Sequence, residues 1–78
     1  MKISKKYNLI DDMTITANSK CYELEAVKSV SVFIEEMGEN PKRCVVELNG
    51  DAMRFEQFKD VLLKDGDVLE VMRIVAGG

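Results

Sequence analysis

The sequence contains no histidine, only one proline and only two cysteines among its 78 residues. Without histidine, the commonest general acid-base group and the imidazole ligands of metal sites are excluded. Cys21 and Cys44 lie far apart in the sequence and match no metal-binding spacing, and a disulfide between them is not expected in a reducing compartment. The chain therefore has few of the side chains that support covalent or metal-assisted catalysis.

Long hydrophobic runs and basic clusters are also lacking. No apolar run approaches the roughly 18 residues that are needed to span a bilayer, and no signal-peptide core follows residues 1–6. The lysines and arginines are scattered and the net charge is −3, so no continuous basic surface faces a nucleic-acid backbone. We therefore expect a cytoplasmic protein that binds neither membranes nor nucleic acids.

The composition that remains, with 46% hydrophobic residues and no low-complexity tract, predicts one small globular domain. Residues 1–12 combine three lysines with isolated apolar residues and end in two aspartates, which indicates an N-terminal extension. Residues 13–74 are expected to form the domain, and residues 75–78 to form a flexible tail.

Alternating residues predict a β-hairpin at the start of the domain. Residues 13–17 place Met13, Ile15 and Ala17 on one side of a strand, Asn18-Ser19 is typical of a tight turn, and residues 20–24 alternate again.

A short helix is expected next, because Ser29 can cap it and Gly38 can end it. The apolar residues between them recur at helical spacing and form a stripe of Val30, Phe33, Ile34 and Met37.

The second half of the chain predicts two further strands, residues 44–48 and 68–75. An Asn49-Gly50 turn follows the first of them, and a turn at residues 64–67 precedes the second. Between them a helical spacing indicates a short α- or 3₁₀-helix with Phe55, Phe58, Val61 and Leu62. The element order predicts an α+β domain in which one main helix packs on one face of a sheet.

Candidate reactive groups are few. The paired acidic residues Glu35-Glu36 fit a solvated helix face, and Asp65-Gly66-Asp67 fits the ordinary use of aspartate in a turn. No serine has a visible base partner, and both cysteines fall in predicted strands, where a small buried residue is common. The sequence therefore predicts neither an enzyme nor a metal site.

The last strand indicates a possible docking surface. If Leu69 and Val71 face the core, then Met72 and Ile74 face outward beside the tail. Two occupants remain open at this stage: a partner protein, or a cover formed by residues 1–12 or by a neighbouring molecule.

The tail Val75-Ala76-Gly77-Gly78 ends in a carboxylate after a strand. Glycine has no Cβ, so Gly77 and Gly78 can enter a narrow channel, and four extended residues reach roughly 13 Å. The alternative is a frayed end without function. A terminal carboxylate is ionised at neutral pH and is a poor electrophile, so any reaction at Gly78 requires its activation.

Three segments carry a family resemblance: Val46-Glu47-Leu48-Asn49-Gly50, Leu63-Lys64-Asp65-Gly66-Asp67-Val68-Leu69-Glu70 and the tail. In this order they resemble the sulfur carrier proteins of thiamine biosynthesis, the ThiS type, over residues 13–78. Within this family the small subunit of molybdopterin synthase (MoaD) is related. The resemblance implies a ubiquitin-like β-grasp fold with a mixed sheet.

The resemblance also implies the reaction and its partners. An adenylyltransferase that resembles ubiquitin-activating enzymes would use ATP and Mg²⁺ to adenylate Gly78, and sulfur from a persulfide donor would then displace AMP. The resulting thiocarboxylate would pass its sulfur to thiazole synthase. Ala76 and Gly77 would let the end enter both partner sites, and the carrier itself would bind no cofactor.

Two features depart from the thiamine carriers. Residues 1–12 precede their usual start, and Phe55-Glu56-Gln57-Phe58 replaces a segment that contains proline in the family. Sulfur transfer to molybdopterin, cysteine, homocysteine or tRNA therefore remains an alternative, as does a ubiquitin-like modifier that is joined to other proteins through Gly78.

Overall fold

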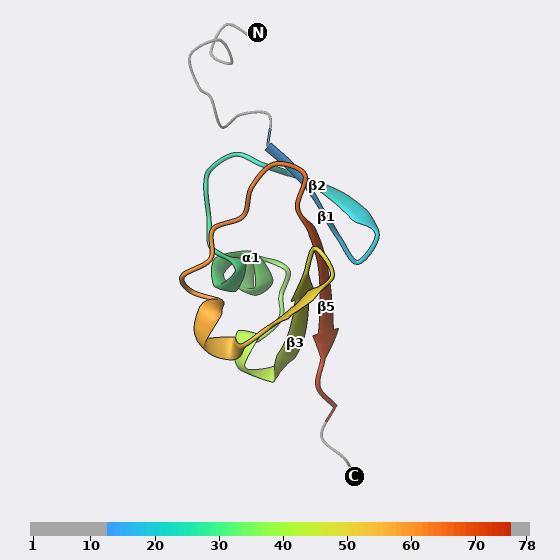
Figure 1. Ribbon diagram of the computed structural model, residues 1–78, viewed down its shortest axis with the longest axis vertical. Coiled ribbons are helices and arrows are strands. Elements are labelled where there is room, and N and C mark those ends of the chain that lie inside the picture. The colour runs from blue at the N-terminus through green and yellow to red at the C-terminus, as the bar shows by residue number, and fades with distance from the viewer. Residues whose placement is uncertain (1–12, 76–78) are drawn as a thin grey trace, which may run out of the picture.

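The computed structural model describes residues 13–75. Within this range the elements follow one another as β1 (Met13–Ala17), β2 (Lys20–Leu24), α1 (Val30–Glu36), η2 (Pro41–Arg43), β3 (Cys44–Leu48), β4 (Asp51–Met53), η3 (Phe55–Gln57) and β5 (Val68–Arg73). The strands form one mixed sheet in the order β2-β1-β5-β3-β4. β5 is parallel to β1 and antiparallel to β3, and α1 lies across one face of this sheet (Figure 1).

The predicted hairpin is confirmed, with β1 and β2 antiparallel and Ala17 opposite Lys20. Asn18 and Ser19 have φ values of 51° and 70°, the left-handed pair that a two-residue type I′ turn requires. Met13, Ile15 and Ala17 are buried, as the alternation predicts.

The predicted helix is confirmed as well. The Ser29 hydroxyl accepts a hydrogen bond from the Val32 N–H at 3.1 Å, which satisfies one free donor of the first turn. Gly38 has a φ of 93° and its N–H donates to the Glu35 carbonyl, so the helix ends where a left-handed residue is available. The stripe faces the sheet and joins one core, made of the buried residues Met13, Ile15, Ala17, Leu24, Val30, Phe33, Ile34, Cys44, Val46, Phe58, Leu63, Leu69 and Val71.

The second half of the chain differs from the prediction in its details. The predicted strand at residues 44–48 is present, but it forms a second hairpin with β4, a strand that the sequence did not indicate. β4 has only three residues and its side chains are mostly exposed, so its sequence shows no alternation of apolar and polar residues that would predict a strand. The last strand ends at Arg73 rather than at Val75.

The helical spacing after β4 was also misread in part. Phe58 is buried as predicted, but Phe55 and Leu62 are 50% and 53% exposed, and Leu63 takes the core position. The reason is that the helical turns end at Asp60: the Val61 N–H still donates to the Gln57 carbonyl, whereas the Leu63 N–H donates to the distant Lys28 carbonyl. A spacing of 3.6 residues therefore holds for only part of this segment.

Candidate functional site

β5 is the strand that leads into the tail, and it lies in the middle of the sheet. β1 borders it on one side and β3 on the other, so its first half is hydrogen-bonded along both edges. The predicted site residues Ala76, Gly77 and Gly78 lie outside the described residues. The structure does describe the residue that precedes them: Val75 is 81% exposed and lies two residues beyond the end of β5.

Two turns that are distant in sequence fix the start of β5. The Asn49 Oδ1 accepts a hydrogen bond from the Val68 N–H at 2.8 Å, and the Asn49 Nδ2 donates to the Asp67 carboxylate at 3.0 Å. The other oxygen of Asp67 accepts from the Lys64 N–H at 2.8 Å. Asp67 is buried, and its carboxylate is satisfied by these bonds. The Asp-Gly-Asp motif thus has the structural role that its turn chemistry predicts.

Asn18 extends the β1 side of the ladder beyond the end of β1. Its backbone N–H donates to the Leu69 carbonyl at 3.0 Å. Its side-chain amide then takes the position of a further strand residue, because Oδ1 accepts from the Val71 N–H at 2.8 Å and Nδ2 donates to the Val71 carbonyl at 3.1 Å. One side chain therefore aligns the middle of the strand that leads into the tail.

We expect Asn18→Gly to lower the free energy of unfolding by about 1–2 kcal/mol, because two side-chain hydrogen bonds are lost while glycine keeps the left-handed φ. Ser19→Gly is the matched control: it relieves a positive φ, and the Ser19 side chain makes no hydrogen bond within residues 13–75, so stability should stay the same or rise slightly. Urea denaturation of both variants measures the difference. Equal losses would show that the Asn18 amide contributes nothing.

An ion pair holds the far end of β5. The Arg73 guanidinium donates two hydrogen bonds to the Glu39 carboxylate, from Nε at 3.0 Å and from Nη2 at 2.9 Å. These hydrogen bonds lower the pKa of Glu39 and raise that of Arg73, so both groups stay charged at neutral pH. The Ile74 N–H donates to the Arg43 carbonyl at 2.6 Å, so the β3 side of the ladder continues one residue beyond β5.

The two cysteines occupy different environments. Cys44 is buried, as expected, and desolvation raises the pKa of its thiol, which lowers the thiolate population. Cys21 is exposed, so the expectation of a buried residue was wrong for it. Cys21 lies opposite Thr16 on the side of the hairpin that faces away from the core, and β2 is an edge strand. Within residues 13–75 no cluster of acidic or cysteine side chains is arranged to hold a metal ion.

The sheet face that points away from α1 carries exposed apolar residues. Met72 and Ile74 are 51% and 49% exposed, which confirms their predicted outward direction. Val45 lies directly opposite Met72 and is 45% exposed, and Val68 is 44% exposed. We call Val45, Val68, Met72 and Ile74 the outer patch. Sequence reasoning missed Val45 and Val68, although the same alternation that identified Met72 also applies to them.

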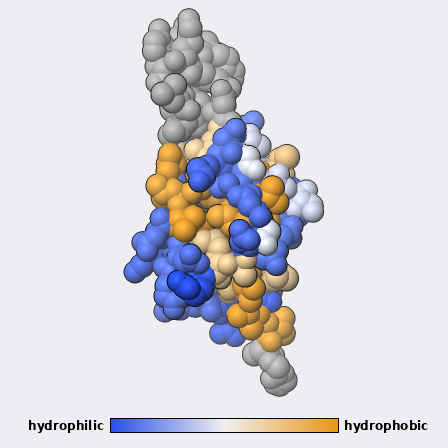
Figure 2. Space-filling model, viewed as in Figure 1, coloured by the Kyte–Doolittle hydropathy of each residue, from blue (hydrophilic) through white to orange (hydrophobic). Residues whose placement is uncertain are grey.

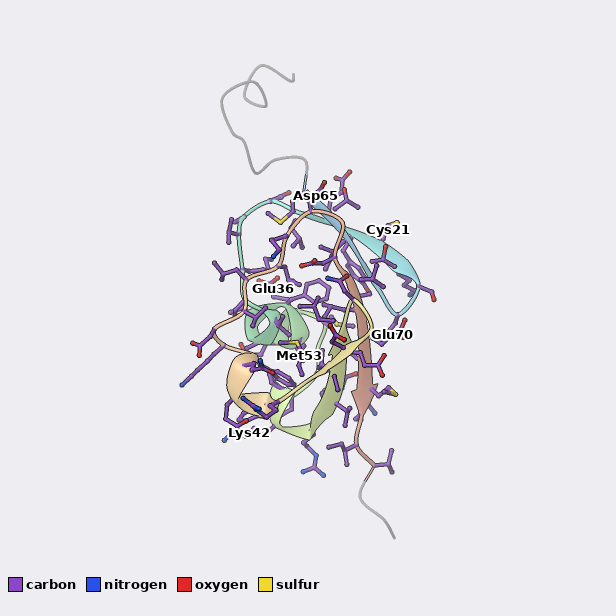
Figure 3. The ribbon with its side chains drawn as sticks, viewed as in Figure 1. Cys21, Glu36, Lys42, Met53, Asp65 and Glu70 are labelled. Atoms are coloured by element: carbon purple, nitrogen blue, oxygen red, sulfur yellow. The ribbon has the colours of Figure 1, made fainter. Side chains whose placement is uncertain are left out.

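Two acidic residues lie beside the outer patch on the same face of the sheet. Glu47 and Glu70 are paired across β3 and β5, in the row between Val68 and Met72, and Figure 3 shows the Glu70 side chain pointing away from α1. Hydrophobic surface continues to the place where the chain runs into its C-terminal residues (Figure 2). The site therefore consists of a tail, the strand that holds its root, and an apolar face beside it. No helix in the described part of the chain is long and apolar enough to cross a membrane.

Comparison with known proteins supports one family. The family model described as the ThiS family matches residues 12–78. Among solved structures, the crystal structure of a thiamine biosynthesis protein (ThiS) from Geobacter metallireducens is 28% identical, with a TM-score of 0.71, and the match covers 85% of this chain and 100% of that one. A solution structure of a thiamine biosynthesis protein from the same organism is also 28% identical, with a TM-score of 0.68 and coverage of 85% and 88%. No curated protein matches the chain.

These matches confirm the β-grasp fold that the resemblance implied. They also agree with the observed sheet, since five strands and one α-helix, with two short 3₁₀-helices, make up the described domain. The chain belongs to the ThiS family and is a sulfur carrier of the ThiS type.

Proposed function

We propose that this protein carries sulfur to thiazole formation in thiamine biosynthesis as a thiocarboxylate on Gly78. The observation that carries the proposal is the support of β5, which is hydrogen-bonded on the β1 side through Val71, by the Asn18 side chain, and on the β3 side through Ile74. A tail whose root is held in this way can be presented in one direction to a deep partner site. The match to the ThiS family and the Gly77-Gly78 tail together favour sulfur transport over a frayed terminus without function.

The reaction begins with activation of the terminal carboxylate. An oxygen of the Gly78 carboxylate attacks the α-phosphate of ATP in the partner adenylyltransferase, which forms the acyl-adenylate and releases pyrophosphate. Mg²⁺ on the partner neutralises the phosphates. The terminal sulfur of a persulfide donor then attacks the acyl carbon and AMP leaves. Reduction of the resulting acyl disulfide by a thiol frees the thiocarboxylate, whose sulfur thiazole synthase accepts.

The carrier contributes position rather than catalysis in this scheme. The buried Cys44 is an unsuitable nucleophile because the pKa of its thiol is raised. Near the root of the tail, Arg73 and Glu39 are hydrogen-bonded to each other. ATP, Mg²⁺ and the persulfide are therefore assigned to the partner proteins, and the carrier acts in the cytoplasm, where reducing thiols are available.

Mass spectrometry of the intact protein tests the proposal. After incubation with ATP, Mg²⁺, the adenylyltransferase of the same organism and a persulfide donor, the chain should gain the mass difference between sulfur and oxygen. The gain should be confined to a C-terminal peptide that contains Gly78. No gain with a demonstrably active adenylyltransferase would contradict the proposal. Thiazole synthase and the large subunit of molybdopterin synthase, offered separately, show which acceptor removes the sulfur.

The outer patch is the proposed docking surface for the adenylyltransferase. Met72→Ser should raise the KM of that enzyme for the carrier about tenfold, because an apolar anchor near the centre of an interface commonly contributes 1–2 kcal/mol. Met72 is half exposed, so the variant should keep its fold.

Val32→Ser provides the matched control for the patch. Val32 is 41% exposed and lies on α1, which covers the opposite face of the sheet. Steady-state adenylation with both variants gives the comparison, and thermal denaturation checks the fold. Equal KM values for Met72→Ser and the unmodified carrier would remove the outer patch from this interface.

A further inference from the structure

The backbone groups of β5 alternate in the side to which they point. The Asn49 N–H donates to the Val68 carbonyl and the Ile74 N–H donates to the Arg43 carbonyl, so the even-numbered residues of β5 bond towards β3. The odd-numbered residues bond towards β1, as shown by the Thr16 N–H on the Asp67 carbonyl and the Asn18 N–H on the Leu69 carbonyl.

The β1 side of this ladder ends before β5 does. β1 stops at Ala17, and the Asn18 side chain satisfies both backbone groups of Val71. The next odd-numbered residue is Arg73. Arg73 lies opposite Cys44 of β3, but as an odd-numbered residue it directs its N–H and carbonyl towards the β1 side, where no residue among 13–75 is paired with it. In Figure 1 the β1–β2 hairpin accompanies only the first half of β5.

The Arg73 side chain leaves this edge open. Its guanidinium donates to both carboxylate oxygens of Glu39. Glu39 belongs to the segment between α1 and η2, so the side chain does not cover the backbone of Arg73 on the β1 side. Proteins usually cover or blunt an open strand edge, because it offers unpaired donors and acceptors to another strand. Here the open edge, at Arg73, lies three residues before Ala76, the first residue proposed to enter the partner site. An edge of one residue is too short to hold two copies of this chain together.

We infer that the backbone of Arg73 pairs with an extended segment of the adenylyltransferase, which continues the sheet of the carrier across the interface. This inference rests on the proposed function. Pairing of this kind uses main-chain groups, so it depends little on side-chain identity. It also fixes the register of the tail: the five residues after Arg73, up to Gly78, span roughly 17 Å when extended, and a bond at Arg73 sets where that length begins.

The test compares Arg73→Pro with Arg73→Ala. Both variants lose the ion pair with Glu39, but only proline also removes the N–H. Proline is tolerated at a strand position whose N–H lies outside the ladder, so both variants should fold. Arg73→Pro should show a KM for the adenylyltransferase that is about three- to tenfold above that of Arg73→Ala, the loss expected for one hydrogen bond. Equal KM values in two folded variants would overturn the inference.

Amide exchange of the unmodified carrier gives a measurement that needs no substitution. The Arg73 amide should exchange rapidly in the free carrier and at least tenfold more slowly in the complex with adenylyltransferase and ATP. Unchanged exchange would overturn the inference, and so would protection that grows with carrier concentration alone, which indicates pairing between copies. If the unmodified chain is not adenylated at all, the proposed function fails. If it is adenylated without protection at Arg73, only the present inference fails.

Discussion

Deleting Gly78 should reduce thiocarboxylate formation by at least about a hundredfold. The new terminal carboxylate, on Gly77, would stop about 3.5 Å short of its position in the partner site, and a displacement of about 1 Å already costs roughly a hundredfold in rate. The ladder bonds at the root of the tail end at Ile74, so the deletion removes no contact among residues 13–75. Intact-protein mass spectrometry after incubation with ATP, the adenylyltransferase and a persulfide donor measures the loss.

Addition of one glycine after Gly78 is the matched control, because it displaces the carboxylate by the same length in the opposite direction. Both variants should unfold at the same urea concentration as the unmodified chain. A deletion variant that still gains the sulfur mass at an undiminished rate would show that Gly78 is not the reacting residue. Such a result would favour a frayed terminus without function.

Leu69→Ala should lower the free energy of unfolding by about 2–5 kcal/mol. Leu69 is fully buried near the start of β5, and truncation of a buried leucine loses both its transfer free energy and the packing around the cavity. For a domain of this size the change corresponds to a fall in Tm of more than about 10 °C. Urea and thermal denaturation at neutral pH give both quantities.

Val68→Ala is the neighbouring control. Val68 belongs to the same strand but is 44% exposed on the outer patch, so its truncation should cost less than about 1 kcal/mol. Similar losses at Leu69 and Val68 would mean that the sheet buries both faces in solution. Such a result would indicate that the outer patch is covered, by residues 1–12 or by a neighbouring molecule.

Local patterns predicted the elements whose side chains alternate or recur regularly. The alternation at Met13, Ile15 and Ala17 and the stripe on α1 each reflect a face that is buried along its whole length. The turns at Asn18-Ser19 and around Gly66 were identified because few residues adopt a positive φ, and these positions do. The outward direction of Met72 followed from the same reasoning, applied to β5.

The features that were missed depend on contacts between distant parts of the chain. β4 is three residues long and exists because β3 offers it an edge, which no local pattern records. Leu63 is buried because its N–H reaches the Lys28 carbonyl across a gap in sequence. The sequence predicts Asn18 and Asn49 only as turn residues, although their side chains also align β5. A side-chain amide that bonds a distant strand produces no periodic pattern in the sequence.

The parallel pairing of β1 and β5 has a mechanical consequence. Because neighbouring strands run in the same direction, a force that pulls Met13 and Val75 apart acts along the strands and loads their hydrogen bonds in shear rather than one at a time. The load falls on the short β1–β5 ladder and on the Asn18 amide that extends it. A partner that draws on the tail therefore pulls against several bonds at once, and the domain can stay folded while its end is held.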